Sequence, residues 1–154
     1  MLEIQKATTP EQLEQVRKLF IEYSQFLGID LCFQNFENEI NNLSSVYSEP
    51  EGGIFLACYN LEVVGCVALK KLEDNTGEIK RLYVKDVNRN MGIGRKLFDK
   101  ILGFAKDKGY KKVRLDTLNS LQSAIKLYKA YGFREIPAYN NTPRNDVLYF
   151  ELGL

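Results

Sequence analysis

Residues 82–97 read LYVKDVNRNMGIGRKL, and they are the most informative stretch of the chain. An apolar, strand-like run enters a polar loop, the loop ends in a Gly-x-Gly, and an amphipathic helix begins immediately. Backbone amides at the start of a helix have no intrahelical partner, and the helix dipole places partial positive charge there. Glycines remove the Cβ atoms that would keep a large anion at a distance. Because Arg89, Arg95 and Lys96 add charge at the same end, the stretch predicts a site for an anion the size of a diphosphate.

Outward from this stretch, the spacing of apolar residues predicts further strands and helices, with no linker to divide residues 1–154 into two domains. Strands are expected at 2–7, 54–59, 63–72, 77–84, 111–118, 133–136 and 146–152. Helices are expected at 10–27, around 33–43, at 92–108 and at 120–131, the first starting with the capping box Thr9-Pro10-Glu11-Gln12. Short turns between the three middle strands require antiparallel neighbours. The order β-α-α-β-β-β-α-β-α-β-β therefore predicts one α/β domain, with a mixed, mostly antiparallel sheet of six to seven strands and about four helices.

The composition excludes several kinds of site. The chain has no histidine, so it can form no Ser-His-Asp triad, no Cys-His dyad and no histidine zinc site. No apolar run reaches the ~18 to 20 residues of a membrane span, and the first residues lack a secretory signal. Cys32, Cys58 and Cys66 are an odd number without a C-x-x-C spacing, which favours a reducing, cytoplasmic compartment. We expect Cys58 and Cys66 to be core residues of a hairpin that turns near Asn60-Leu61 and pairs residue 58 with about residue 64.

Two known glycine-rich motifs fail on the 82–97 stretch. A dinucleotide fingerprint needs a third glycine where Leu97 stands, and a P-loop needs Gly-Lys-Ser/Thr. The loop instead resembles the acyl-CoA motif (R/Q)-x-x-G-x-(G/A) of the GNAT acetyltransferase superfamily, matched here as Arg89-Asn90-Met91-Gly92-Ile93-Gly94 between a strand and a helix. Residues 114–136 resemble a second stretch of that family, a strand and a helix ending A-x-x-L-Y-x-x-x-G-F, with Ala124, Leu127, Tyr128, Gly132 and Phe133 at those positions.

The resemblance implies an N-acetyltransferase that uses acetyl-CoA and no metal, and that transfers acetyl directly to a primary amine. The cofactor-binding residues that it implies are Leu82, Tyr83, Val84, Arg89, Asn90, Met91, Gly92, Ile93, Gly94, Arg95, Lys96, Asn119 and Tyr128. Backbone groups of 82–84 are expected to bind the pantetheine arm and polarise the acetyl carbonyl, and Tyr128 to donate to the departing thiolate. A phenol with a pKa of about 10 is protonated at neutral pH, as this role requires. Tyr128 as a core aromatic, and Asn119 as a helix N-cap shared with Ser120, are the structural alternatives.

No histidine is available to deprotonate the amine, so the catalytic base must be a different group. Glu78, at the head of the strand before the glycine loop, is the first candidate, acting directly or through water. Asp116 on the following strand is the second candidate, and a passive solvent route stays open. A plain surface carboxylate at a strand end is the alternative for Glu78.

The acceptor is the least constrained part of the prediction. The resemblance implies a pocket that includes Tyr23, Phe26, Phe33, Tyr139 and Asn140, for a small-molecule or peptide amine. Neither nucleic acid nor a membrane is expected as a partner, and a homodimer is left open. A catalytically silent acyl-CoA-binding regulatory module of the same fold is the alternative function, although the presence of Tyr128 beside the glycine loop favours an enzyme.

The charges of the chain are divided between its halves. Residues 1–79 hold 5 Lys+Arg and 13 Asp+Glu, whereas residues 80–154 hold 16 and 7, which together give the net charge of +1. The division predicts that a cationic acceptor is steered by an acidic side of the cleft and CoA by a basic side. Acidic residues scattered over outer helix faces are the alternative.

Overall fold

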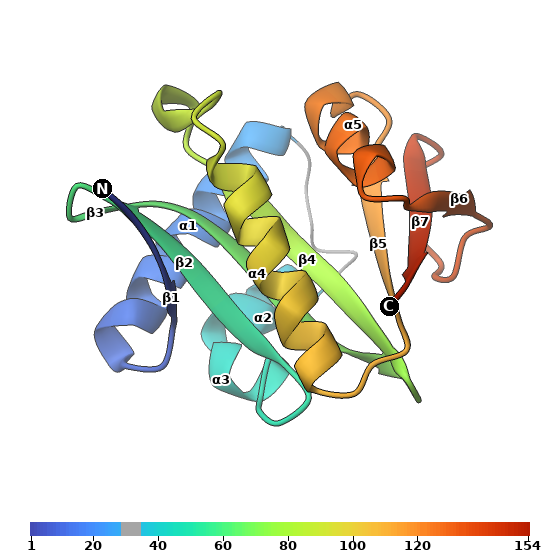
Figure 1. Ribbon diagram of the computed structural model, residues 1–154, viewed down its shortest axis with the longest axis horizontal. Helices are drawn as coiled ribbons and strands as arrows, with labels where there is room; N and C mark the ends of the chain where they lie inside the picture. The colour runs from blue at the N-terminus through green and yellow to red at the C-terminus, as the bar shows by residue number, and fades with distance from the viewer. Residues whose placement is uncertain (29–34) are drawn as a thin grey trace.

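The computed structural model describes residues 1–28 and 35–154, and Figure 1 shows one twisted sheet with helices packed against it. The strands are β1 (Leu2–Lys6), β2 (Gly53–Tyr59), β3 (Glu62–Glu73), β4 (Thr76–Val84), β5 (Lys112–Leu118), β6 (Arg134–Ile136) and β7 (Val147–Gly153). The helices are α1 (Pro10–Leu27), α2 (Phe36–Asn41), α3 (Leu43–Val46), α4 (Ile93–Asp107) and α5 (Gln122–Ala130), with a 3-10 turn η2 (Asp86–Asn88) before α4. The expected residues Cys32 and Phe33 lie outside the described part of the chain.

The sheet has seven strands in the order β1-β2-β3-β4-β5-β7-β6. Neighbouring strands are antiparallel except β4 and β5, which are parallel. Pairing between β4 and β5 is confined to Thr76–Glu78 against Lys112–Arg114, so the two strands separate toward their carboxyl ends. The mixed, mostly antiparallel sheet expected from the sequence is confirmed, and the site described below lies where these two strands part.

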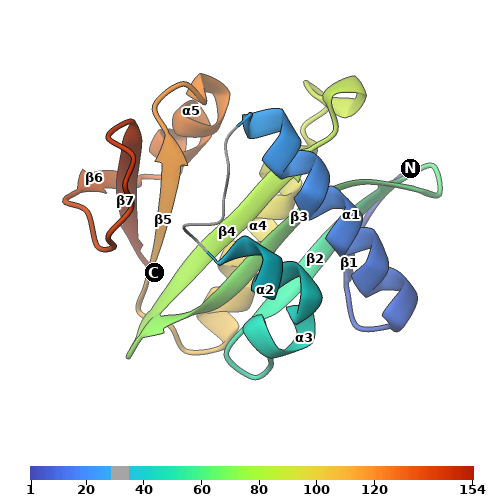
Figure 2. The same cartoon turned by 180° about the vertical axis from the view of Figure 1, so that it is seen from behind.

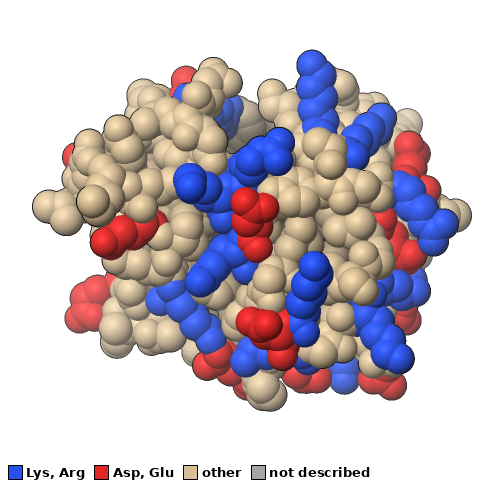
Figure 3. Space-filling model, viewed as in Figure 1, with Lys and Arg blue, Asp and Glu red and all other residues tan. Residues whose placement is uncertain are grey.

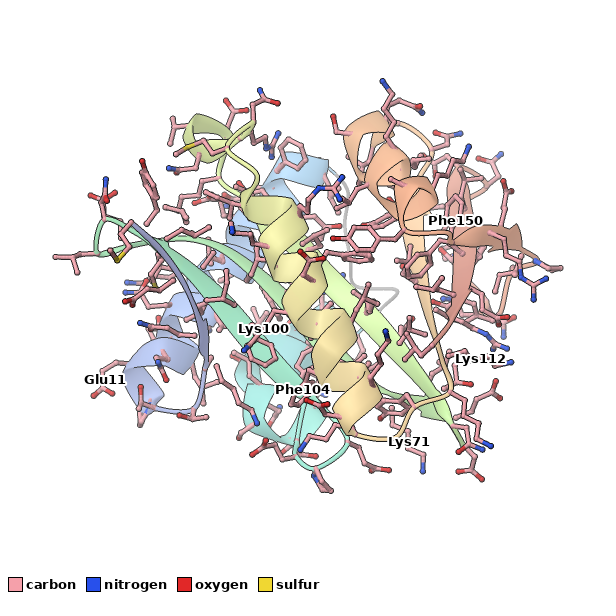
Figure 4. All side chains as sticks on the ribbon, in the orientation of Figure 1. Glu11, Lys71, Lys100, Phe104, Lys112 and Phe150 are labelled. Carbon is pink, nitrogen blue, oxygen red and sulfur yellow. The ribbon has the colours of Figure 1, made fainter. Side chains whose placement is uncertain are left out.

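Helices cover both faces of the sheet. Figure 1 shows α4 and α5 on one face, and Figure 2 shows α1, α2 and α3 on the other. On the α4 face, Leu97 and Ile101 are fully buried one helical turn apart, against strand residues such as Val67. Phe104 of α4 also packs on Phe55 of β2, with ring centroids 5.2 Å apart (Figure 4). Burying one such side chain contributes roughly 1.5–3 kcal/mol, so this apolar stripe holds α4 against the sheet.

Helix α1 begins and ends as its sequence indicates. The Thr9 side chain accepts a hydrogen bond from the Gln12 backbone N–H at 3.1 Å, and the Gln12 side chain accepts one from the Thr9 N–H at 3.0 Å. Pro10 occupies the first helical turn, where no intrahelical amide bond is lost. Gly28 ends the helix with φ of 67°, a left-handed conformation that glycine adopts without strain.

Two expectations about local structure need correction. The single helix expected around residues 33–43 is divided at Asn42 into α2 and α3, because the Asn42 side chain donates to the Asn38 carbonyl at 2.9 Å and competes with the helical bond. The hairpin does turn at Asn60-Leu61, and residue 58 pairs with Val63, close to the expected partner, with an unexpected bulge between Ala57 and Cys58. Cys66 is buried as expected, whereas Cys58 is only half-buried and its thiol lies 3.7 Å from Gln5 Oε1.

Within the described ranges, no helix combines the length and the apolar character needed to cross a bilayer.

Candidate functional site

A cleft of about 430 Å³ lies beside the diverging ends of β4 and β5. Four elements border it: the end of α1, the end of β4 with the following loop, the start of α4 and the start of α5. Its lining residues are Tyr23, Phe26, Leu82, Tyr83, Val84, Asn88, Arg89, Asn90, Gly92, Ile93, Gly94, Ser120, Leu121, Gln122, Ser123, Ala124 and Leu127. The segment 82–94, singled out from sequence, therefore forms one wall, and the start of the helix that follows β5 contributes the opposite one.

Strand β4 carries a β-bulge just before it reaches the cleft. Lys80 pairs with Ala68 and Tyr83 pairs with Cys66, so Arg81 and Leu82 together oppose the single residue Val67. The extra residue of a bulge is left out of the ladder and bends the strand. Arg81 takes up the bend with φ of 62°. Backbone groups of β4 are thereby freed from the sheet where Leu82 begins to line the cleft.

The start of α4 has no side-chain cap among the described residues. Gly92 is the N-cap, with φ of 76°, and accepts the backbone N–H of Lys96 at 3.2 Å. The first amides of the helix consequently point outward without an intrahelical partner. A Cβ at Gly92 would meet no atom within 4 Å, and one at Gly94 would meet only Val84 Cγ2, at 3.9 Å. The loop is therefore open to a ligand at the end of the helix that favours anions.

The basic side chains of this loop have different surroundings. Arg89 packs over the Phe26 ring at 4.3 Å, donates from Nε to the Val84 carbonyl at 3.1 Å and pairs with Asp86. Its main contacts therefore close the loop onto β4 and α1. Arg95 and Lys96 are exposed on the first turn of α4 and flank the cleft. Met91 is 43% exposed and, like these two residues, is not part of the cleft lining.

Tyr128 lies one helical turn after Ala124, which lines the cleft, but its ring is buried beneath α5. Phe98, Phe133 and Phe150 surround it, with ring centroids 5.4, 6.0 and 6.3 Å away. Burial raises the pKa of Tyr128 well above its ordinary value, and Tyr23 and Asp116 raise it further. The phenol is therefore protonated at neutral pH. The ring of Tyr128 can pack in the core while its hydroxyl donates a proton. Burial of the ring is therefore compatible with the expected role in catalysis.

Asn119 lies just outside the cleft lining. Helix α5 starts later than expected, at Gln122 with Leu121 as N-cap, so neither Asn119 nor Ser120 caps it. The Asn119 backbone N–H donates to the Asp146 carbonyl at 2.9 Å, and the neighbouring Ser120 lines the cleft instead. The lining residues 121–123 were not singled out from sequence as part of the site; the signal available for them is their position at the start of the helix that follows β5.

Glu78 is buried, which rules out the plain surface role. It lies where β4 still pairs with β5, and its Oε2 accepts a hydrogen bond from the Tyr139 hydroxyl at 2.8 Å. Burial, followed by the Glu78 charge, raises the pKa of Tyr139, so this hydroxyl stays protonated and donates.

Asp116 on β5 is held by hydrogen bonds in a similar way. Its Oδ2 accepts the Asn140 side-chain N–H at 3.1 Å, and Asn140 Oδ1 accepts the Tyr149 hydroxyl at 2.7 Å. Tyr139 and Tyr149 pack edge to face, with ring centroids 5.1 Å apart. The structure thus brings both candidate bases together with Tyr139 and Asn140, two residues of the expected acceptor pocket. Tyr23 and Phe26 of that pocket line the cleft, and Phe33 lies outside the described residues.

Comparisons with known proteins agree with this architecture. The model of the acetyltransferase (GNAT) family matches residues 13–133. An uncharacterized N-acetyltransferase of Schizosaccharomyces pombe is 33% identical over 99% of this chain and 95% of its own, and one of Dictyostelium discoideum is 31% identical over 94% and 95%.

Solved structures share the fold. A GNAT acetyltransferase from Staphylococcus aureus has a TM-score of 0.82 at 24% identity, covering 99% of both chains. A GNAT acetyltransferase from Elizabethkingia anophelis, determined with acetyl-CoA bound, has a TM-score of 0.67 at 25% identity and covers 99% of this chain and 98% of its own. This chain belongs to the acetyltransferase (GNAT) family and is an acyltransferase enzyme.

Proposed function

We propose that this enzyme transfers the acetyl group of acetyl-CoA to a primary amine. One observation carries the proposal: the uncapped start of α4 and the bulged end of β4 border one cleft. The first element suits a diphosphate. The second suits the pantetheine arm of CoA, whose amides need backbone hydrogen-bond partners. The acetyl-CoA found in the Elizabethkingia anophelis relative supports the choice of co-substrate.

The diphosphate of CoA binds the amides of about residues 91–95, flanked by Arg95 and Lys96. The pantetheine arm runs along Leu82–Val84, whose backbone groups bond its amides. A free N–H of the same segment donates to the acetyl oxygen, where negative charge develops during the reaction. Such preorganised donors contribute the largest share of the rate enhancement in many acyl transfers. Asn90, Ile93 and Asn119 complete the proposed contacts with the cofactor.

Acetyl transfer proceeds by direct attack. The neutral amine nitrogen bonds to the thioester carbon and gives a tetrahedral oxyanion. Collapse of this intermediate breaks the C–S bond, and the Tyr128 hydroxyl provides the proton that the thiolate takes up. The attacking nitrogen loses its extra proton to Glu78, directly or through water, with Asp116 as the second candidate. The products are an N-acetyl amine and CoA with a free thiol, and solvent returns the proton to Tyr128.

The acceptor is a small-molecule or peptide amine. It enters from the side of the cleft bordered by Tyr23 and Phe26 and approaches the carboxylates held by Tyr139 and Asn140. The enzyme acts in a reducing compartment, the cytoplasm. The odd number of cysteines and their spacing without a C-x-x-C support this location.

The test measures release of free thiol from acetyl-CoA while the protein is offered a panel of amines. Thiol release that depends on an added primary amine is expected. Stoichiometric CoA binding without release for any amine would instead mean a silent acyl-CoA-binding module.

The assignment of the glycine loop is tested separately by calorimetry with CoA. Gly94→Asp is expected to abolish measurable affinity, because it adds bulk and like charge where the diphosphate approaches. Gly103→Asp is the matched control, since Gly103 is exposed on the same helix and a Cβ there meets no atom within 4 Å. Equal CoA affinity in the two variants would contradict the assignment.

A further inference from the structure

A buried ion pair joins the bulge of β4 to helix α2. Arg81 donates from Nε to Glu39 Oε2 at 3.0 Å and from its Nη2 to Oε1 at 2.7 Å. The two side chains are 5% and 7% exposed. Glu39 Oε2 also accepts the Tyr47 hydroxyl at 2.7 Å, and the Phe36 ring lies 5.5 Å from the guanidinium. The pair is bidentate, so it fixes the direction of the Arg81 side chain as well as its position.

Arg81 is also strained at the backbone. Its φ of 62° lies in the left-handed region, which disfavours a residue with a Cβ. The Arg81 carbonyl accepts the Cys66 thiol at 3.3 Å, a weak bond. Strained conformations persist only where the surroundings over-determine them, and they gather at functional sites. The bidentate pair with Glu39 is the strongest of the surrounding contacts here.

The strained residue directly precedes the wall of the cleft. Leu82, Tyr83 and Val84 follow Arg81, and their register against β3 is shifted by the bulge that Arg81 creates. A β4 strand without the bulge would turn this segment by one residue, which exchanges the two faces of the strand. The orientation of the segment that borders the cleft therefore depends on the conformation of Arg81.

We propose that Glu39 and Arg81 are positioning residues: their ion pair holds the β4 bulge and thereby aims the backbone amides of residues 82–84 at the acetyl oxygen. This inference rests on the proposed function. Folding does not in general need an ion pair at a buried place, because apolar side chains of similar volume often replace one without loss, whereas removal of a single partner is costly. The largest expected effect of the Glu39–Arg81 pair is on turnover, while CoA affinity, which also depends on the start of α4, falls by less when the pair is lost.

The test compares two double variants that differ by one methyl group, Glu39→Gln/Arg81→Gly and Glu39→Gln/Arg81→Ala. Both remove the ion pair and leave no buried charge unpaired. Glycine adopts φ near 62° without strain, whereas alanine favours an ordinary strand. In the alanine variant kcat is expected to fall about 10²-fold, the loss typical of one missing oxyanion donor. The glycine variant is expected to retain most of kcat and to bind CoA as the wild type does, whereas in the alanine variant CoA affinity falls by less than kcat.

A second readout does not depend on activity. Backbone amide NMR shifts of residues 82–84 in the free protein are expected to stay near the wild-type values in the glycine variant and to move in the alanine variant. The positioning role would be overturned if the amide shifts were unchanged in both variants. It would also be overturned if the shifts differed between the two variants while kcat was the same in both. Absence of turnover in the wild type would refute the proposed function instead, and the NMR comparison would still test the bulge.

Discussion

At the scale of single residues, the environment of a side chain decides which chemistry it can perform. Tyr128 shows this most clearly. Apolar contacts with Phe98, Phe133 and Phe150 keep water from its ring, and this burial raises the pKa of its hydroxyl. A hydroxyl that stays protonated can donate to a thiolate. It cannot serve as a base at neutral pH, which leaves that role to the carboxylates held by Tyr139 and Asn140.

Replacing Tyr128 by phenylalanine keeps the ring and removes only the donor. Turnover is expected to fall by roughly 10²-fold, while CoA affinity and the unfolding temperature change little. Thiol-release kinetics and calorimetry measure the two quantities. Tyr131→Phe is the control, because its hydroxyl bonds Asp99 on the outer side of α4 and α5. Wild-type turnover in the Tyr128→Phe enzyme would leave Tyr128 with the core role alone.

At the scale of elements, helix α1 and the β4–β5 pair decide the shape of the cleft. The last turns of α1 bring Tyr23 and Phe26 against Tyr83 of β4, with ring centroids 5.5 and 5.8 Å away. The β4–β5 pair opens because hydrogen bonding stops after Glu78. Separation of β4 and β5 creates the cleft, and the end of α1 closes one side of it. The shape of the cleft therefore depends on the placement of α1 as well as on the pairing of the strands.

The contribution of the capping box to the stability of the fold can be measured with a single substitution. Thr9→Ala is expected to lower the free energy of unfolding by about 1 kcal/mol, because the Gln12 amide loses its acceptor. Urea denaturation measures the change. Thr8→Ala is the control, since its hydroxyl makes only a 3.5 Å contact with the Gln12 side chain. Equal stabilities of the two variants would contradict a structural role for the cap.

At the scale of the whole molecule, the structure shows where the acidic residues of the first half and the basic residues of the second half lie. Most acidic residues of the first half are exposed, many on loops and outer helix faces: Glu3, Glu11, Glu14, Glu37, Glu49, Glu51, Glu62, Glu73 and Asp74. None of these residues lines the cleft, and several pair with nearby lysine or arginine, whereas Glu22 accepts the hydroxyl of the cleft residue Tyr83 at 2.7 Å. Basic side chains do gather over α4 and α5, as Figure 3 shows.

Steering is therefore expected to be stronger for the anionic cofactor than for a cationic acceptor. The association rate of CoA should fall as salt rises from ~0.01 to ~0.15 M, because the Debye length shrinks from about 30 to about 8 Å. Stopped-flow measurements of CoA binding give this rate. The comparison is the second-order rate constant for the amine acceptor, measured at saturating CoA. This rate constant should change less with salt than the association rate of CoA. A CoA association rate that ignores salt would contradict the inference.

Stability against acid follows from carboxylates held by arginine. Burial raises the pKa of Glu39, but hydrogen bonds and charge from Arg81 outweigh it, and the net pKa lies below the ordinary 4.5. The hydrogen bond from Arg114 lowers the pKa of Glu151 in the same direction. Carboxyl groups with a lowered pKa stabilise the folded state above their unfolded pKa, and this contribution is lost as pH falls through the folded value.

The unfolding temperature is consequently expected to be steady between pH 7 and 5 and to drop below about pH 4.5. Scanning calorimetry across this range checks it. Glu151→Gln removes one of the contributing groups and should show a shallower acid drop than the wild type. An identical pH profile in that variant would remove Glu151 from the explanation.

The sequence by itself determined the features that depend on neighbours in the chain. Caps, turns and apolar periodicity act over a few residues, so they can be predicted locally. These features are the capping box at Thr9, the turn at Asn60-Leu61, the glycine loop before α4 and the order of elements. The resemblance carried by residues 89–94 and 124–133 then predicted the family correctly.

Only the tertiary structure decided which distant groups meet. Glu78 and Tyr139 are 61 residues apart, and Arg81 and Glu39 are 42 apart. Nothing in either local segment specifies these pairs, because burial and charge compensation depend on how the helices and the β6–β7 connection pack against the sheet. The partner that holds the β4 bulge, and the opening between β4 and β5, follow from packing across the whole sheet.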